Sequence, residues 1–425
     1  MKKIIKPIII FILAFLARSV LHRYRPRIVM VSGSVGKTST KDAVAAVLAT
    51  KFYVRKSEKS FNSEFGVPFT VLGVGNPWDD PFAWLSLIKS ALALLLLPNH
   101  YPSILVLEVG ADRPGDLARI LRFVTPNAVV ITRLPEIPVH VEAYASPEAV
   151  REEEFSPAYA LPAGAPLVIP ADDPYAVASA KGTAARIMSY GVSEHAAVRA
   201  SDIAFNESNG KIDGMRAYIR TSDELGMCVV HGSVGEIQIL PVVAAIAVAQ
   251  AFQISLTDAL DALTGYEAPA GRGHLLAGKN GSVIIDDSYN ASPIAVEEAL
   301  KTLKNFPHSN GRRIAVLGDM LELGRYSVME HERIADFVGT SADVIVTIGI
   351  RARVFGTAAP GVEILQFNNS REAAAVLTDF VREGDVVLVK GSQSIRTERI
   401  VEALLAHKED SAKLVRQEKK WHERI

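Results

Sequence analysis

The stretch at residues 27–42, RIVMVSGSVGKTSTKD, restricts the fold of this chain more than any other part of the sequence. It joins a short, branched apolar run to a turn bounded by Gly33 and Gly36, and then to the pair Lys37-Thr38. Glycines allow the backbone to turn tightly and to bring its N–H groups against phosphate oxygens. Lys37 supplies a positive charge, and the Thr38 hydroxyl can ligate Mg²⁺. The stretch therefore predicts a strand, a phosphate-binding loop and a helix whose positive dipole end faces the phosphates.

The glycine spacing is that of a short phosphate-binding loop. The general Walker pattern places a glycine five residues before Gly36, and Val31 stands there, so the match is to the shorter form Gly-x-x-Gly-Lys-Thr. A chance turn is the alternative, but the strand-like run before the loop and the helix-like run after it favour phosphate binding. The residues expected to bind the nucleotide here are Gly33, Ser34, Val35, Gly36, Lys37, Thr38 and Ser39.

Charge and cysteine content narrow the class of protein. The formal net charge of the 425 residues is −1, so no field of the whole chain attracts nucleic acid. The single cysteine, Cys228, excludes an internal disulfide and favours a reducing compartment, and it is best interpreted as a small buried apolar side chain. We therefore expect a cytoplasmic, monomeric enzyme with no nucleic-acid partner.

The N-terminal segment differs from this pattern. Residues 1–27 contain no acid, and an uninterrupted apolar run occupies residues 7–17. A second apolar stretch, FAWLSLIKSALALLLL, follows at residues 82–97. The basic residues of the first segment are Lys2, Lys3, Lys6, Arg18, Arg23, Arg25 and Arg27. A basic helix at residues 1–26, lying in the inner-leaflet interface or crossing as a short tilted span, fits this composition. The alternative is that both stretches are ordinary helices packed on the domain.

The rest of the chain alternates strand-like and helix-like runs. Branched apolar runs at 27–32, 103–109, 128–132 and 166–169 predict a mostly parallel sheet, and residues 198–232 predict a small antiparallel patch. After a linker at 266–273 the alternation restarts and predicts a second doubly wound sheet over about 270–405. We expect an α/β protein with a central phosphate-loop domain at 27–268 and a Rossmann-like domain at 269–425. The polar tail at 408–425 is expected to be a solvated helix.

Motifs spread over the chain resemble those of the Mur ligase family. They are GSVGKTSTKD at 33–42, SFNSEFGVPFTVL at 60–72, LEVGADRPGDLARI at 107–120, VHVEAYASPEAV at 139–150, IIDDSYNASP at 284–293, LGDMLELG at 317–324 and VLVKGSQS at 387–394. Each is weak alone, but their order and spacing together are specific. Within the family, the resemblance is to the type that joins D-alanyl-D-alanine to a UDP-N-acetylmuramoyl-tripeptide.

The resemblance implies an ATP- and Mg²⁺-dependent amide ligase of peptidoglycan precursor synthesis. In that chemistry a muropeptide carboxylate attacks the γ-phosphate of ATP, and the amine of D-Ala-D-Ala then attacks the acyl phosphate. The protein must neutralise charge around the transferring phosphoryl group. We expect the enzyme to act at the inner face of the cytoplasmic membrane, because of its N-terminal segment.

The resemblance also implies roles for single residues. Lys37, Glu108, His140 and Arg272 are the expected catalytic residues, and Thr38, Glu108 and His140 the expected metal ligands. Glu108 has an independent argument, since it ends the run LVLE where a doubly wound sheet presents groups to ligand. A surface salt bridge is the alternative for Glu108, and a solvated charge is the alternative for Arg272.

Further residues are expected to contact substrates. Arg272, Asp287 and Asn290 would bind the nucleotide, with Tyr289 in the same pocket; a turn at a strand end is the alternative for the DDSYN stretch. Asn62 resembles a residue that faces the muropeptide, although an asparagine in a turn is nearly as good an interpretation. The expected positions near the incoming dipeptide are Lys390 and Ser392.

The sequence departs from the family pattern in several places. The amino-terminal uridine-nucleotide domain of the family is expected to be missing, since the phosphate loop begins at residue 33. Ile237 and Gln238 stand where the family usually has His-Asn or His-Gln, which contacts adenine. The segment 133–139 is longer than usual and begins with Arg133 in place of asparagine. Glu154 occupies the place of a carbamylated lysine, and we expect it to support the second metal; a solvated acid in a charged run is the alternative.

These departures leave two alternatives for the function. One is a related ligase with another acceptor, such as a folylpolyglutamate synthase or a polymer-specific amino-acid ligase. The other is a membrane-bound nucleotide-binding scaffold that has lost the reaction. Lys37, Glu108 and Arg272 count against loss of the reaction, whereas Glu154 and Ile237 count for it.

Overall fold

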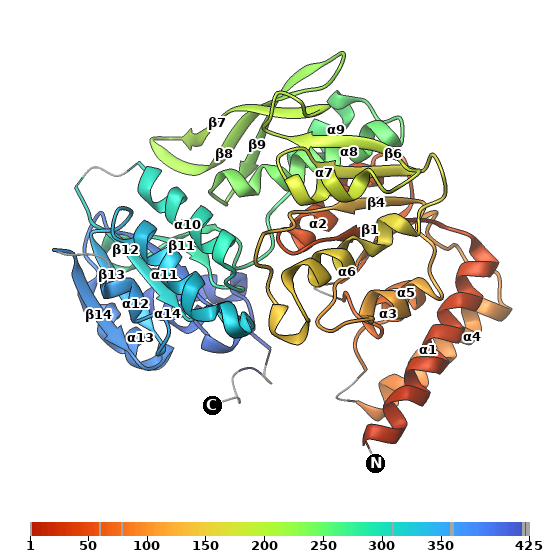
Figure 1. Ribbon diagram of the computed structural model, residues 1–425, viewed down its shortest axis with the longest axis horizontal. Helices are drawn as coiled ribbons and strands as arrows, with labels where there is room; N and C mark the ends of the chain where they lie inside the picture. The colour runs from red at the N-terminus through yellow and green to blue at the C-terminus, as the bar shows by residue number, and fades with distance from the viewer. Residues whose placement is uncertain are drawn as a thin grey trace. The chain divides into compact units, whose positions relative to one another are not determined.

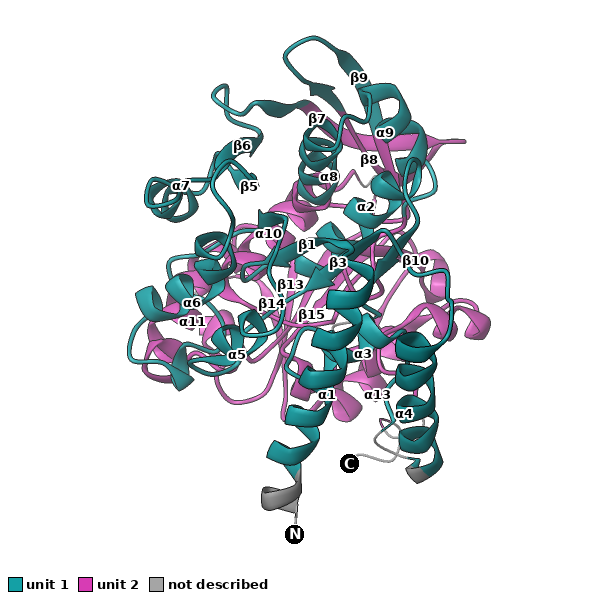
Figure 2. Cartoon of the chain, turned by 90° about the vertical axis from the view of Figure 1, so that its right-hand side faces the viewer, with its two compact units in different colours: residues 1–201, 218–228, 240–266 teal, residues 202–217, 229–239, 267–425 magenta. Residues whose placement is uncertain are grey.

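The computed structural model describes residues 2–58, 61–77, 80–307, 310–357, 361–418 and 421. The chain forms two compact units, and each is described here by itself (Figure 2). Unit 1 comprises residues 1–201, 218–228 and 240–266, and unit 2 comprises residues 202–217, 229–239 and 267–425. The three-part division at residues 26 and 268 stays a prediction.

A nine-stranded sheet carries the phosphate loop (Figure 1). Its order is β2 (Val54–Lys56), β3 (Ile104–Glu108), β1 (Arg27–Ser32), β4 (Ala128–Ile131), β5 (Pro166–Pro170), β6 (Arg186–Gly191), β7 (Val198–Ser208), β8 (Lys211–Arg220) and β9 (Leu225–His231). Neighbours from β2 to β7 pair in parallel. The two-residue turn at Asn209 and Gly210, both with positive φ, joins β7 to β8 as an antiparallel hairpin.

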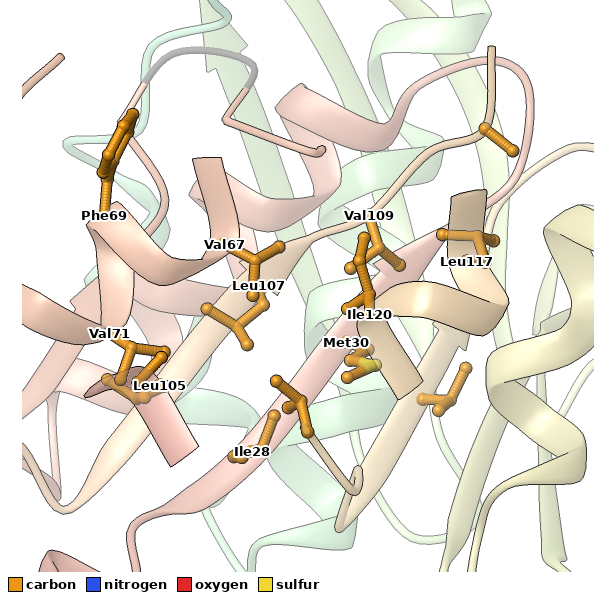
Figure 3. Packing of buried hydrophobic residues seen from close by; sticks show 14 of the residues in the cluster. Ile28, Met30, Val67, Phe69, Val71, Leu105, Leu107, Val109, Leu117 and Ile120 are labelled. Carbon is orange, nitrogen blue, oxygen red and sulfur yellow. The ribbon is translucent and has the colours of Figure 1, made fainter. Parts of the chain in front are cut away.

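Helices cover both faces of the parallel part of this sheet, which explains why its strands are almost continuously apolar. The helices of the unit are α2 (Lys37–Ala49), α3 (Gly66–Leu72), α5 (Asp116–Leu121), α6 (Pro147–Tyr159), α7 (Pro174–Ala180), α8 (Leu240–Ala251) and α9 (Leu256–Leu263), with the 3₁₀ turn η1 (Val141–Ala143). Figure 3 shows side chains of β1 and β3, such as Met30 and Leu107, packed with Val67 of α3 and Ile120 of α5. This core fixes the strand ends from which the loop starts.

Two apolar helices, α1 (Lys2–Tyr24) and α4 (Pro81–Leu96), lie side by side in both views (Figures 1 and 2). The Tyr24 hydroxyl donates to the Leu94 carbonyl at 2.7 Å, and Arg23 donates to the carbonyls of Leu95 and Leu97. The carboxyl ends of the helices are therefore tied together, so the two helices run in the same direction.

Unit 2 contains a second, six-stranded sheet. Its order is β10 (His274–Ala277), β11 (Val283–Asp287), β15 (Val386–Lys390), β12 (Arg313–Gly318), β13 (Val344–Ile348) and β14 (Glu363–Phe367), and only the β10–β11 pair is antiparallel. The helices are α10 (Pro293–Asn305), α11 (Ser327–Val338), α12 (Val354–Thr357), α13 (Ser370–Phe380) and α14 (Glu398–Leu404). Short 3₁₀ turns complete it: η2 (Glu236–Gln238), η3 (Lys279–Gly281), η4 (Gly324–Tyr326), η5 (Gln393–Ile395) and η6 (Lys408–Lys413).

The predicted α/β class is confirmed, with two mostly parallel sheets and an apolar N-terminal helix. The buried Cys228, on β9, is also as predicted. The prediction of a solvated C-terminal helix is wrong for the described residues. After η6, the side chains of Leu414, Val415 and Arg416 are buried, because they pack onto unit 2 rather than continue a helix.

Candidate active site

The phosphate loop leaves β1 in a conformation that only glycine adopts easily. Gly33 and Gly36 have φ angles of +120° and +89°. A Cβ atom on Gly33 would collide with the Thr132 hydroxyl and come within 3.0 Å of the Thr132 nitrogen. The Ser34 nitrogen donates to the Arg133 carbonyl at 2.9 Å, so the segment after β4 holds the loop. Helix α2 begins directly after the loop, and its amino end supplies N–H groups for an anion.

The Lys37 ammonium folds back over this loop. Its Nζ donates to the Gly33 carbonyl and, at 3.4 Å, to the Ser34 carbonyl. It also lies 3.9 Å from Oε1 of Glu154, and its side chain is only 16% exposed. A positive charge is therefore already held where phosphates would meet the loop.

Glu154 is joined to the loop by its side chain and its backbone. The residue, on α6, is 1% exposed, and its Oε2 accepts a hydrogen bond from the Ser34 hydroxyl. The Ser32 hydroxyl donates to the Glu154 carbonyl at 2.6 Å. Burial raises the pKa of Glu154, while Lys37, Ser34 and His140 act in the opposite direction. Glu154 is therefore not a solvated acid of a charged run.

Glu108 is the last residue of β3 and lies beside Val31 of β1 in the sheet register. It is 1% exposed, so the alternative of a surface salt bridge is wrong. Its Oε2 lies 4.0 Å from Nζ of Lys41, which donates to the Ser57 carbonyl at 2.8 Å. The sequence analysis missed Lys41, although its spacing of four residues from Lys37 on α2 places both on one helix face.

Asn62 lies close to the lysine of the loop. A Cβ atom added to Gly110 would lie 3.0 Å from Nδ2 of Asn62 and 3.4 Å from Cε of Lys37. The Gly110 nitrogen also donates to the Asn62 carbonyl at 3.1 Å. The two side chains therefore lie around the Cβ position that Gly110, another residue that the sequence analysis missed, leaves unfilled, and a side chain there would crowd both.

His140 has a left-handed backbone conformation, with φ of +68°, and its Nε2 lies 3.6 Å from Oδ1 of Asp112. Thr38, at the start of α2, is 8% exposed. Within the described ranges, no three His, Cys, Asp or Glu side chains are gathered closely enough to hold a metal ion by themselves. The predicted ligands Thr38, Glu108, His140 and Glu154 thus do not form a ready-made cage.

This arrangement fits a nucleotide with Mg²⁺. The loop offers backbone N–H groups, a lysine and glycine-only φ angles to phosphate. The hydroxyl of Thr38 and the carboxylates of Glu108 and Glu154 are the hard oxygen donors that Mg²⁺ prefers. Mg²⁺ commonly keeps several waters and binds through one or two protein groups plus phosphate oxygens, so a preformed cage is not required.

Unit 2 gathers the other predicted residues at the carboxyl ends of β11 and β15. The Lys390 ammonium donates to Oδ2 of Asp287 at 2.6 Å and to the Asn290 carbonyl at 3.0 Å. Burial lowers the pKa of Lys390, and Asp287 opposes that effect. Ser392 accepts from the Leu321 nitrogen at 2.8 Å through its hydroxyl. Lys390, predicted for the dipeptide, therefore shares one hydrogen-bonded cluster with Asp287 and Asn290, predicted for the nucleotide, and Ser392 bonds to the neighbouring Leu321.

Arg272 is stacked rather than solvated. Its guanidinium lies 4.1 Å from the centre of the Tyr289 ring, which corrects the alternative of a solvated charge. Gln238, in the place where the family usually has the second residue of His-Asn or His-Gln, is buried on η2. A Cβ atom on Gly273 would lie 3.2 Å from Nε2 of Gln238, so this amide lies against the segment that follows Arg272.

Comparison with known proteins identifies the family. The Mur ligase middle domain matches residues 31–249, and the Mur ligase glutamate ligase domain matches residues 271–393. A UDP-N-acetylmuramoyl-tripeptide–D-alanyl-D-alanine ligase of Bacillus subtilis is 26% identical over 397 residues, covering 92% of this chain and 78% of that protein. The enzyme of the same name from Mycobacterium tuberculosis strain CDC 1551 is 30% identical over 404 residues, covering 89% and 73%.

Among solved structures, the MurF ligase of Thermotoga maritima in complex with ADP has a TM-score of 0.75 at 25% identity. The similarity covers 95% of this chain and 84% of that one. The middle-domain match alone spans more than half of the residues, and it includes the loop, Glu108 and Glu154. The chain therefore belongs to the Mur ligase family.

Proposed function

We propose that the protein is an ATP-dependent ligase that joins D-Ala-D-Ala to a muramoyl-tripeptide during peptidoglycan synthesis. Relatives that cover most of the chain carry this activity in their names. The observation that supports it best is the loop itself, where Gly33 and Gly36 have positive φ and Lys37 lies over the backbone carbonyls. A scaffold without activity would not need a buried, loop-directed carboxylate such as Glu154.

In this proposal, the residues of unit 1 neutralise charge at the transferring phosphoryl group. Lys37 binds the β- and γ-phosphates, and the N–H groups at the start of α2 bind phosphate oxygens. Thr38 and Glu108 would hold Mg²⁺, which supplies charge compensation when bound, and Glu154 would support the second metal. His140, near Asp112, is the proposed ligand of a second metal. Asn62, which lies with Lys37 beside Gly110, would face the muropeptide.

The residues of unit 2 would recognise the nucleotide sugar and the second substrate. Arg272 binds phosphate in this proposal, and its stacking on Tyr289 restricts the side chain before ATP arrives. Asp287 and Asn290 bind the ribose, with Lys390 fixing the orientation of the Asp287 carboxylate. Ser392, like Lys390, is proposed to lie near the dipeptide.

The activity is tested by a substrate screen with mass determination of the product. Phosphate release should require ATP, a UDP-muramoyl-tripeptide and D-Ala-D-Ala together, and the product mass should equal the sum of tripeptide and dipeptide substrates less water. Lys37→Ala serves as the inactive control. Phosphate release with L-glutamate in place of the dipeptide would support a folylpolyglutamate-type ligase instead. ATP binding without turnover on either screen would indicate a scaffold.

We also propose that the protein acts at the inner face of the cytoplasmic membrane. Of the described residues, one helix, Lys6–Tyr24, is long and apolar enough to cross a membrane by length and composition. Leu13, Leu16, Ala17 and Val20 on one face of α1 are buried. The opposite face carries Ile8, Phe11, Ile12 and Phe15, exposed by 44% to 72%. That spacing is one continuous helical stripe.

Helix α4 extends the exposed apolar area. Its outward residues at helical spacing are Phe82, Leu85, Ile88, Leu92 and Leu96, exposed by 42% to 78%. We call these five side chains and the α1 stripe the apolar surface. Neither residues 1–27 nor residues 81–107 contain an acid, while Arg18 and Lys89 interrupt the apolar spacing of their helices. Acids lie beside the amino ends of the two helices, where Asp80 caps α4 and Glu64 pairs with Lys6. Apolar side chains with mostly basic neighbours match an anionic leaflet.

Vesicle sedimentation tests the membrane location with the full-length protein. Binding should be strong to phosphatidylglycerol-containing vesicles, weaker to phosphatidylcholine alone, and partly sensitive to salt. The double variant Phe11→Asp, Leu85→Asp should reduce binding at least about tenfold, since charged residues oppose apolar insertion. Val328→Asp, on an equally exposed apolar residue of unit 2, is the matched control and should bind normally. Equal binding of all three proteins would contradict the location.

A further inference from the structure

The C-terminal segment after η6 turns back onto the strand-end residues of unit 2. Arg416 is 8% exposed and has a left-handed φ of +60°. Its Nη1 donates to the Ser288 carbonyl at 3.3 Å, and its Nη2 donates to the Tyr289 carbonyl. Both carbonyls belong to the segment directly after β11, which carries Asp287. One arginine near the C-terminus therefore holds the backbone of the predicted nucleotide-binding segment.

Arg416 is itself fixed by a buried ionic network. Its Nη1 donates to Oε2 of Glu398 at 2.8 Å, and Arg396 donates through Nε to the other carboxylate oxygen. Glu398 is 1% exposed, at the start of α14. Arg396 shares the left-handed backbone conformation, with φ of +63°. Uncharged side chains of similar volume often stabilise a protein core as much as a buried ionic network does. What such a network can add is a single defined conformation of the residues that it joins.

The same segment contacts the residues that carry Arg272. A Cβ atom on Gly271 would lie 3.0 Å from Cγ1 of Val415 and 3.0 Å from the Tyr289 nitrogen. The Tyr289 nitrogen donates to the Gly271 carbonyl at 3.2 Å, and the Arg272 guanidinium stacks on the Tyr289 ring. Gly271 is thus enclosed between the C-terminal segment and Tyr289. A movement of Val415 or Arg416 would therefore displace Gly271 and Tyr289, which contact this segment.

We propose that Arg416, with Val415, is a positioning residue for nucleotide binding. It bonds to the Tyr289 carbonyl and to the Ser288 carbonyl, while Lys390 bonds to Asp287 and to the Asn290 carbonyl. In that arrangement, Arg272 and Asp287 already have the ATP-binding orientation before ATP binds. The inference rests on the nucleotide-binding roles proposed above for Arg272 and Asp287.

The test compares Arg416→Ala, Arg416→Lys and Lys413→Ala in the full-length protein. Lys413 is exposed and pairs with the nearby Asp410, so its replacement removes the same charge three residues away from Arg416. The Kd of MgATP is measured by calorimetry without muropeptide, together with thermal stability, KM for ATP and kcat. We expect Arg416→Ala to weaken ATP binding on the order of tenfold, which is less than one charged hydrogen bond contributes. Arg416→Lys should restore part of the affinity, and Lys413→Ala should bind like the wild type.

A lower melting temperature with an unchanged Kd for ATP would show that Arg416 only stabilises the fold, and would overturn the inference. If Arg416→Ala does not fold, Val415→Ala decides the same question, because it removes the contact to Gly271 and keeps the ionic network. A wild-type protein that does not bind ATP would overturn the proposed function and this inference together. Normal ATP binding by the wild type, by Arg416→Ala and by Val415→Ala would overturn this inference alone.

Discussion

Replacing Glu154 by glutamine removes one buried charge from the phosphate loop and keeps its shape. Oε1 of Glu154 lies 3.9 Å from the Lys37 ammonium, and Oε2 accepts from Ser34. ATP must therefore compete with Glu154 for Lys37. Bound Mg²⁺ would relieve this competition, because the cation neutralises the carboxylate.

The size of the effect follows from the distance. Two unit charges 3.9 Å apart interact by about 4 kcal/mol at an effective dielectric constant of about 20. Only part of this energy appears in binding, since water and the Ser34 hydroxyl compensate the carboxylate. If one third remains, Glu154→Gln binds Mg²⁺-free ATP about tenfold more tightly than the wild type. Turnover with Mg²⁺ should instead fall about 10²-fold, the loss expected for a group that supports a metal.

The assay measures the Kd of ATP by calorimetry with EDTA and with Mg²⁺, and then ligation with Mg²⁺. The Kd of ATP with EDTA, divided by the Kd of ATP with Mg²⁺, should be smaller in Glu154→Gln than in the wild type. Glu154→Lys provides a second test. A lysine that has reacted with CO₂ carries its carboxylate roughly 3.5 Å farther from the backbone than glutamate does, at ~1.2 Å per bond. The wild type should be indifferent to bicarbonate, and the lysine variant should regain ligation only when bicarbonate is added. An unchanged Mg²⁺ dependence together with normal turnover in Glu154→Gln would refute the reasoning.

Three further predictions follow from the loop. Lys37→Ala should lower ligation at least ~10²-fold, the cost of one preorganised transition-state donor, in a protein that still folds; near-normal turnover in the folded variant would remove the loop assignment. Gly33→Ala should cost about 1–3 kcal/mol in urea unfolding, since its φ is +120° and its Cβ meets Thr132, whereas the control Gly75→Ala has open space and should be neutral. Burial raises the pKa of Glu154, so the folded protein holds this proton more tightly than the unfolded chain, and the contribution of Glu154 to stability is lost as pH rises through its folded pKa. Glu154→Gln should flatten that part of the pH–stability profile above about pH 4.3, and identical profiles would contradict the assignment.

The parallel strands could be predicted well because burial on both faces makes them continuous apolar runs. The run at 27–32 has the same limits in the structure. The C-terminal segment could not be predicted in this way. Its burial depends on Glu398 and Tyr289, which are distant in sequence, and no local periodicity reveals an arginine that pairs across such a separation.

The candidate site was only partly visible in the sequence. Spacing and glycines marked Lys37 and the loop, and the family resemblance marked Glu154. The hydrogen bond from Ser34 to Glu154 and the buried position of Lys41 arise from packing of separate elements, so a single sequence carries no signal for the contacts themselves. A lysine one helical turn after the loop would ordinarily be interpreted as a solvated charge.

The buried Cys228 has a practical consequence for spectroscopy. Burial raises the pKa of its thiol to about 12, so almost none of it is thiolate at neutral pH, and maleimide reagents have little access to it. The natural chain therefore behaves as if it were free of cysteine. A single cysteine introduced at Phe11 or Leu85 can carry a polarity-sensitive dye or a spin label without background, and its signal would report how deeply each helix enters a bilayer.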